Sequence, residues 1–411
     1  MPQAWHYRRA RLRKLCRRGH VDVEDLRRAT RRVLRARAAH GVLRHYERPT
    51  VSTAAHHQLA LDSACASIIV ARNQCGILPL KSTQRIGVVG PLGSVASLGS
   101  EGSASVAPPF SISPLEGLRE VCRNVSHEPR TSAKVVGRFA RRVDVVVVVF
   151  GSRPRDEGEY FPLLGGGDRK SLSIRSAEVN ALLAAVDSGR PTVAVWVGGG
   201  LPALGAWETR VPCIVFAGHG GMQGGLALAR VLTGQAVASG HLTACVPREG
   251  DDLPPFNPDA KHVVYDRWFD YRRYDRIQRQ PLFNVGSGSA QTTLHTEEAR
   301  IVSDAIGPNE DIEVRVRVRN TGPCPAEPLL TIFTGHARND DTRELRSLRG
   351  FAKARIEPGD VRELTARVRP HDLAVYDPSS GCWRIDRQAH RVWHSVCGST
   401  PELLGEVEIR S

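Results

Sequence analysis

The sequence lacks an apolar run of membrane-spanning length, and its first residues, MPQAWHYRRARLRKLC, carry charge without the apolar segment that follows in a signal peptide. The nine cysteines are odd in number and scattered, with neither CxxC pairs nor His/Cys ligand spacing. This argues against a zinc site and against a disulfide framework. We therefore expect a cytoplasmic protein in a reducing compartment, with no membrane partner.

Lysines are few, and aromatic residues make up only 6% of a chain whose formal net charge is +14. Such a charge would ordinarily suggest a nucleic-acid partner. The arginines beyond the N-terminus are spread singly, however, and aromatic residues are not interleaved with a basic patch, so we expect no nucleic acid. No GxGxxG motif opens a helix with an acidic residue at the expected distance, which argues against dinucleotide binding.

The chain of 411 residues is long enough for two or three domains, and its hydrophobic content of 41% is enough to form their cores. Its central feature is the run Val145–Phe150, which predicts a strand buried on both faces. The loop after it carries the carboxylates Asp156, Glu157 and Glu159, and further on Asp168 and Arg169. Ligands of open α/β sheets collect beyond the carboxyl ends of strands, so the loop is a candidate site. Mutual repulsion among the carboxylates predicts a raised pKa for at least one of them.

Apolar strands, glycine turns and helices alternate around this feature, which is typical of βαβ units and a mostly parallel sheet. The patterns predict helices over 1–45, over 51–80 up to a break at Gly76, from Ser113, over 177–186 and over 226–232, and strands over 86–89, 145–150, 191–197 and 213–217. Residues 250–291 are irregular, aromatic and basic. Alternating runs follow, such as Ile312, Val314, Val316 and Val318, and they predict a β-sandwich of roughly a hundred residues.

The order of these parts resembles glycoside hydrolase family 3, the β-glucosidase and β-xylosidase family. The resemblance rests on the following motifs: Gly19-His20-Val21-Asp22, Thr30 to Arg35 and Gly41-Val42-Leu43; His57 to Ser67, Asn73 and Ile77 to Leu80; Ile86 to Pro91, Ser113 to Leu118, and Gly167-Asp168-Arg169 with Leu172; Asn320-Thr321-Gly322, Leu348 to Phe351 and Glu357-Pro358-Gly359. The motifs occur in the family's order over nearly the whole chain, but the chain begins late in that order.

The fold that the resemblance implies has three parts. Residues 1–50 are expected to be a short helical remnant of a (β/α)8 barrel, and residues 51–250 a three-layer α/β sandwich with a mostly parallel sheet. Residues 251–295 are a connecting segment, and residues 296–411 a fibronectin type III-like β-sandwich.

The resemblance also implies an O-glycosyl hydrolase that acts on terminal β-linked sugars with retention, without metal or cofactor. Retention needs two carboxyl groups about 5 Å apart. The family nucleophile is an aspartate on a barrel strand absent from this chain. Glu157 is the better match to the acid/base glutamate, because Glu-Gly precedes the Asp-Arg landmark, and Glu159 is the runner-up. Asp168, Arg169, Glu101 and Ser103 are the expected substrate-binding residues.

Three interpretations remain open at this stage. The chain is an enzyme whose barrel comes from a separate chain, a non-catalytic remnant (pseudoenzyme) that binds carbohydrate or a protein, or a truncated reading frame. The family loop that the resemblance matches to residues 99–104 departs from its usual residues at Ser100, Glu101 and Ala104, and Gln223 stands where glutamate is usual. If the N-terminal helices normally pack on a barrel, their exposed apolar faces promote self-association.

Overall fold

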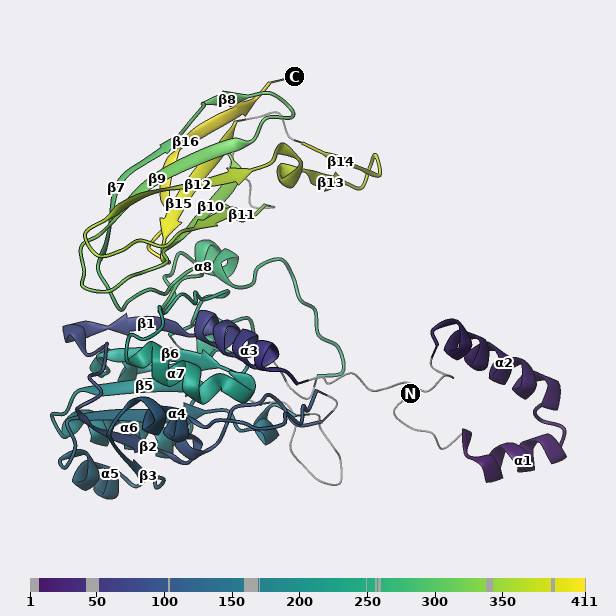
Figure 1. Ribbon diagram of the computed structural model, residues 1–411. Coiled ribbons are helices and arrows are strands. Elements are labelled where there is room, and N and C mark those ends of the chain that lie inside the picture. The colour runs from purple at the N-terminus through teal and green to yellow at the C-terminus, as the bar shows by residue number, and fades with distance from the viewer. Residues whose placement is uncertain are drawn as a thin grey trace. The chain divides into compact units, whose positions relative to one another are not determined.

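The computed structural model describes residues 7–41, 52–102, 104–158, 169, 171–248, 250–255, 257, 260–337, 343–385 and 389–410 (Figure 1). The helices are α1 (Arg9–Arg17), α2 (Val23–Ala39), α3 (Ala54–Ser67), α4 (Pro114–Val121), α5 (Ala133–Ala140), α6 (Ser176–Asp187), α7 (Gly224–Leu232) and α8 (Tyr271–Ile277). Within the described residues, none of these helices combines the length and the apolar character needed to cross a bilayer.

Among the described residues, strands β1 to β6 form one sheet, and the strands from β7 onward belong to other sheets. The strands up to residue 336 are given first. They are β1 (Ile69–Asn73), β2 (Arg85–Val89), β3 (Asn124–Glu128), β4 (Val145–Gly151), β5 (Thr192–Val197), β6 (Cys213–Gly218), β7 (Leu294–Ile301), β8 (Ala305–Ile306), β9 (Ile312–Asn320) and β10 (Leu329–His336). The remaining strands are β11 (Ser347–Lys353), β12 (Val361–Val368), β13 (Val375–Asp377), β14 (Cys382–Arg384), β15 (His390–Val396) and β16 (Glu402–Ile409).

Helices α1 and α2 belong to a compact unit of their own, Met1–Ala54, and the rest of the chain forms a second unit, Ala55–Ser411. Asp22 caps α2, because its carboxylate accepts a hydrogen bond from Glu24 N. Neither helix buries a residue, and Val23, Val33 and Leu34 are 48%, 57% and 45% exposed. The apolar face predicted for these helices therefore exists and is uncovered within their unit.

The α/β part is built on a six-stranded sheet with the order β1-β6-β5-β4-β2-β3. Strands β2 to β6 pair in parallel, and only β1 runs antiparallel, against β6. Every residue of β4 and β5 is buried, as the continuous apolar runs predict. One face of the sheet packs with α3, α4 and α7, and the other with α5 and α6. This is the expected three-layer sandwich (Figure 1).

The prediction of helix from residue 51 to the break at Gly76 was wrong in its second half. Helix α3 ends at Ser67, and Ile69–Asn73 form the edge strand β1. Ile69 pairs with Phe216 and Asn73 with Cys213. This segment is a strand because it pairs with a strand more than a hundred residues further along the chain. The local apolar spacing, which continues from α3, does not show that pairing.

The C-terminal part is a β-sandwich, as expected. Its sheets have the orders β11-β10-β15-β16-β8 and β12-β9-β7. The residues of β9 that were expected to face a core are all fully buried, namely Ile312, Val314, Val316 and Val318. A separate hairpin, β13-β14, pairs with neither sheet. The segment between the α/β part and the sandwich is irregular except for short helices, of which α8 packs through Tyr271 and Tyr274 on Phe333 and Trp393.

Candidate active site

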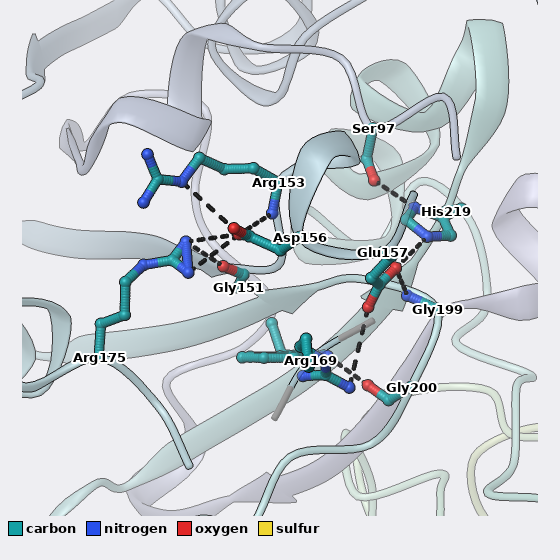
Figure 2. Close-up of polar contacts among 11 residues, drawn as sticks. Ser97, Gly151, Arg153, Asp156, Glu157, Arg169, Arg175, Gly199, Gly200 and His219 are labelled. Atoms are coloured by element: carbon teal, nitrogen blue, oxygen red, sulfur yellow. Dashed lines mark hydrogen bonds and ion pairs between the residues drawn. The ribbon is translucent and has the colours of Figure 1, made fainter. Parts of the chain in front are cut away.

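The candidate site lies where four parallel strands end. Glu157 follows β4, Gly199 follows β5, His219 follows β6, and Ser97 lies in the loop after β2. Carboxyl ends of neighbouring parallel strands meet at one edge of a sheet, so the fold brings these four loops together. Figure 2 shows Ser97, His219, Gly199 and Glu157 in contact at this edge.

The loop after β4 separates the carboxylates that are adjacent in sequence. Gly151 closes the strand, and Pro154 begins a one-turn 3-10 helix, Pro154–Asp156, directly before Glu157. Successive side chains of such a turn point about 120° apart. Asp156 Oδ2 accepts hydrogen bonds from Arg153 N at 2.8 Å and from Arg175 Nη1 at 3.0 Å. Glu157 points the other way, toward His219 (Figure 2).

The Glu157 carboxylate is held by two donors on one oxygen. Its Oε2 accepts hydrogen bonds from Gly199 N at 2.9 Å and from His219 Nε2 at 2.8 Å. An ionised carboxylate only accepts, so the His219 proton lies on Nε2. His219 Nδ1 lies 2.8 Å from Ser97 Oγ, within hydrogen-bond distance of the Ser97 hydroxyl. The site contains a hydrogen-bonded chain from Ser97 through His219 to Glu157.

The pKa of Glu157 is lowered, although this residue lies among the carboxylates that crowd the loop. Burial raises this pKa. It is lowered by more than this by the hydrogen bonds from Gly199 and His219, by the nearby Ser152 hydroxyl and by the His219 charge, so the net shift is downward. Ser152 Oγ does not meet ordinary hydrogen-bond geometry with the carboxylate, so we count it as a polar neighbour. Glu157 is therefore not the carboxylate with a raised pKa, because its donors outweigh burial and Asp156 is turned toward arginine. Glu159 lies outside the described residues, so a raised pKa for at least one carboxylate of the loop stays a prediction.

The other oxygen of Glu157 is left available. Oε1 is buried and has no hydrogen-bond partner in the part of the chain that the structure describes. Arg169 Nη2 lies 3.8 Å from it, at the long limit of an ion pair. The Arg169 guanidinium in turn lies over the Trp196 ring, 5.8 Å from its centroid, and beside Gly200, where a Cβ would stand 2.6 Å from Nη2. An acceptor oxygen near an arginine, without a partner, suits proton exchange with a bound molecule.

A pocket of about 560 Å3 has Arg169 in its lining, whereas Glu157 is not one of the residues that line it. Its lining includes Arg169, Ser171, Ser173, Leu253 and Arg273. The volume is within the range of small-molecule sites, and the lining mixes hydroxyl and guanidinium donors with apolar surface. Space for a ligand therefore exists on the Arg169 side of Glu157.

The remaining expected site residues divide into two groups. Glu101 is brought to the acidic loop, because Glu101 N donates to Pro154 O at 3.1 Å and its Cβ lies 3.1 Å from where a Cβ on Gly158 would stand. Glu159, Asp168 and Ser103 lie outside the described residues. Gln223 is buried, and its Oε1 has no partner among the described groups.

The sequence analysis missed His219, Ser97 and the Gly199 amide. The signal for Gly199 and His219 was present, since each lies in a glycine-rich turn after a predicted strand. No cluster of three or more His, Cys, Asp or Glu side chains able to hold a metal occurs among the described residues. The arrangement offers acid/base chemistry from one carboxyl group.

Comparison with known proteins gives two family matches. The model of the glycosyl hydrolase family 3 C-terminal domain matches residues 68–290, and that of the fibronectin type III-like domain matches residues 331–395. Beta-glucosidase BoGH3A of Bacteroides ovatus is 25% identical over 431 residues, with 96% of this chain and 57% of that protein covered. A thermostable beta-glucosidase B of Acetivibrio thermocellus is 26% identical, with 81% and 45% covered. A beta-xylosidase of Formosa agariphila is 26% identical, with 84% and 50% covered.

Solved structures agree on the fold. The beta-glucosidase of Kluyveromyces marxianus in complex with glucose superposes with a TM-score of 0.79 at 18% identity, covering 100% of this chain and 70% of that one. The beta-D-glucoside glucohydrolase of Trichoderma reesei gives 0.74 at 20% identity, covering 87% and 56%. The chain spans about half the length of the first curated relatives that it matches.

Proposed function

Because the chain belongs to glycoside hydrolase family 3, we propose that its α/β domain supplies the acid/base carboxyl group for hydrolysis of a terminal β-linked sugar, and that this group is Glu157. The observation that carries the proposal is the state of the Glu157 carboxylate. One oxygen is fixed by Gly199 and His219, and the other is buried beside Arg169 without a hydrogen-bond partner among the described residues. A fixed carboxyl group with one available oxygen suits proton transfer to a leaving group.

The substrate class follows from the relatives, which are named as beta-glucosidases and a beta-xylosidase. Hydrolysis with retention needs a nucleophilic carboxylate about 5 Å from the acid/base group. We propose that this nucleophile lies on a (β/α)8 barrel outside the 411 residues, in a longer protein or in a separate chain. One carboxyl group alone provides a factor on the order of 10² to 10⁴, which is far below the rate enhancement of a glycosidase.

The N-terminal helices fit the same proposal. Their apolar residues Val23, Val33 and Leu34 are exposed in their own unit. We propose that a barrel covers this face in the complete enzyme. The isolated chain is then expected to self-associate, and sedimentation of the chain with and without residues 1–50 tests this: removal of these residues should shift the population toward the monomer.

A second candidate function is a non-catalytic, sugar-binding pseudoenzyme. The observation that favours it is the lowered pKa of Glu157, because a general acid must hold a proton when the substrate binds. The two candidates therefore differ in whether Glu157 is required for turnover.

The test is a chimera in which the N-terminal barrel portion of the Bacteroides ovatus beta-glucosidase precedes residue 1 of this chain. We expect hydrolysis of a 4-nitrophenyl β-glucoside by the chimera and none by the 411 residues alone. Glu157→Gln should lower kcat by about 10² or more, because the glycosyl-enzyme is then hydrolysed without a general base. Asp156→Asn should lower it far less, since Asp156 binds Arg175 instead. Equal turnover of the chimera and its Glu157→Gln variant would refute the assignment.

A further inference from the structure

The β13-β14 hairpin of the C-terminal sandwich presents two aromatic rings that contribute little to any core. Trp383 is 69% exposed and Tyr376 is 49% exposed. The two residues are cross-strand partners, and their rings make an edge-to-face contact with centroids 5.6 Å apart. Such a contact helps to hold the hairpin together. It leaves most of the Trp383 surface uncovered, and large exposed aromatic surfaces are characteristic of binding sites.

The hairpin is fixed by its turn. Asp377 accepts hydrogen bonds from Ser379 N at 2.9 Å, from Ser379 Oγ at 2.6 Å and from Ser380 Oγ at 2.7 Å. Arg384 Nε lies 3.3 Å from the same carboxylate. An isolated two-stranded hairpin is only marginally stable without such ties. The aromatic rings are therefore held in a defined position before any ligand binds, which reduces the entropy lost on binding.

A pocket of about 300 Å3 opens between the two aromatic residues and the sandwich. Its polar lining includes three arginines, Arg267, Arg343 and Arg349, together with Glu344, Thr334 and His336. Arg343 Nη1 donates to His336 Nε2 at 2.9 Å, so part of this lining is already hydrogen-bonded. Arg349 is exposed and makes no ion pair or hydrogen bond with another described residue. The pocket thus combines flat aromatic faces with a hydroxyl and a guanidinium donor.

We propose that this pocket, which we call the hairpin pocket, binds a neutral oligosaccharide, with one sugar ring on Trp383 and its hydroxyl groups hydrogen-bonded by Arg349 and Thr334. Sugar rings have apolar C–H faces and polar edges, which match aromatic faces beside directional donors. The volume of about 300 Å3 suits one or two sugar rings. The choice of a glycan as the ligand rests on the proposed function; the pocket itself does not involve Glu157.

The test is calorimetric titration of the full chain with the neutral sugars cellohexaose and xylohexaose, and with polygalacturonate as an anionic glycan. We expect binding of at least one of them, weakened about tenfold by Trp383→Ala and retained by Trp383→Tyr, which keeps a ring. Arg349→Ala should weaken binding without touching the hairpin. Phe351→Ala is the matched control, because Phe351 is 73% exposed in the same domain but does not line the pocket.

Several outcomes would overturn the proposal. The first is that neither hexasaccharide binds at millimolar concentration. The second is that the Trp383→Ala and Arg349→Ala variants both bind with the same affinity as the wild type. The third is that only polygalacturonate binds and that salt abolishes this binding, which would assign the site to anions. Glu157→Gln should leave the affinity unchanged. If Glu157→Gln abolishes binding, the sugar occupies the site on the α/β domain, and the hairpin pocket is not the site.

Discussion

His219 Nε2 lies 2.8 Å from Glu157 Oε2 and joins the loops that follow β6 and β4. The contact gives the buried carboxylate a donor from a residue 62 positions away in the sequence. Together with the Gly199 amide, it outweighs the effect of burial on the pKa of Glu157. The ionisation of the candidate acid/base group therefore depends on a histidine from another loop.

Replacing His219 by alanine should raise the pKa of Glu157, because the variant loses a donor to the carboxylate and a source of positive charge. A buried acceptor that loses a partner also costs about 1–2 kcal/mol of unfolding free energy at neutral pH. The pKa is measured by ¹³C NMR titration of labelled glutamate carboxyl groups, with the Glu157 signal assigned from its absence in Glu157→Gln. His127→Ala is the control, since that imidazole binds Gly90 O instead of a carboxylate. An unchanged Glu157 pKa in His219→Ala would contradict the account.

Gly151 is required where β4 turns into the acidic loop. Its φ is +147°, and a Cβ there would lie 1.9 Å from Val197 O on the neighbouring strand. Gly151→Ala must push β4 and β5 apart and should cost about 3 kcal/mol. Gly218 also has a positive φ, of +58°, at the end of β6, but a Cβ there meets nothing within 4 Å. Gly218→Ala should cost only about 1 kcal/mol, and urea unfolding of both variants measures the difference. Equal losses would show that the close contact with Val197 does not matter.

The stability of the chain should depend on the protonation of His241. Burial, and then the Lys353 charge, lower the pKa of His241 to about 4. The unfolded chain takes up a proton near pH 6.5, so between these values it binds more protons than the folded chain. The stability that His241 contributes is present above pH 6.5 and is lost as the pH falls toward about 4, by on the order of 2–3 kcal/mol.

This pH dependence is measured by urea unfolding at intervals from pH 7 to pH 4. The loss of stability over this range should be smaller in His241→Gln than in the wild type. His295→Gln is the control, because His295 is exposed on β7. If the wild type and His241→Gln lose stability in parallel, the imidazole is not kept neutral by the fold.

The fold could be predicted to a large extent because its central strands are continuous apolar runs and its C-terminal strands alternate. The two edge strands of the α/β sheet, β1 and β3, were harder to predict from the sequence. Residues 69–73 continue the apolar spacing of the preceding helix, and β3, with the sequence NVSHE, has few apolar residues to reveal it. Both segments become strands through pairing with a neighbour that local periodicity does not encode.

The sequence predicted the carboxylate of the candidate site but not the groups that bind it. The loop that carries Glu157 was singled out because acidic residues gather after a recognisable buried strand, and the choice of Glu157 within it rests on the family resemblance. The partners of Glu157 could not be identified as such, since the Ser97–His219 contact links positions 122 residues apart and Gly199 acts through its backbone amide. The lowered pKa of Glu157 was not predictable for the same reason: charge spacing along the sequence does not show that Asp156 turns toward Arg175 or that Gly199 and His219 donate to Glu157.

The most direct test of the central claim, that Glu157 is the acid/base group, is rescue of the Glu157→Ala chimera by azide with a 2,4-dinitrophenyl β-glucoside. This leaving group departs without protonation, so the covalent glycosyl-enzyme still forms. It then accumulates, because the variant lacks the base that activates water for its hydrolysis. Azide attacks without needing one. The account predicts a rate that rises with azide concentration and a β-glucosyl azide product, with no azide effect on the unmodified chimera. A Glu157→Ala variant that hydrolyses this substrate at the unmodified rate, with no azide product, would contradict it.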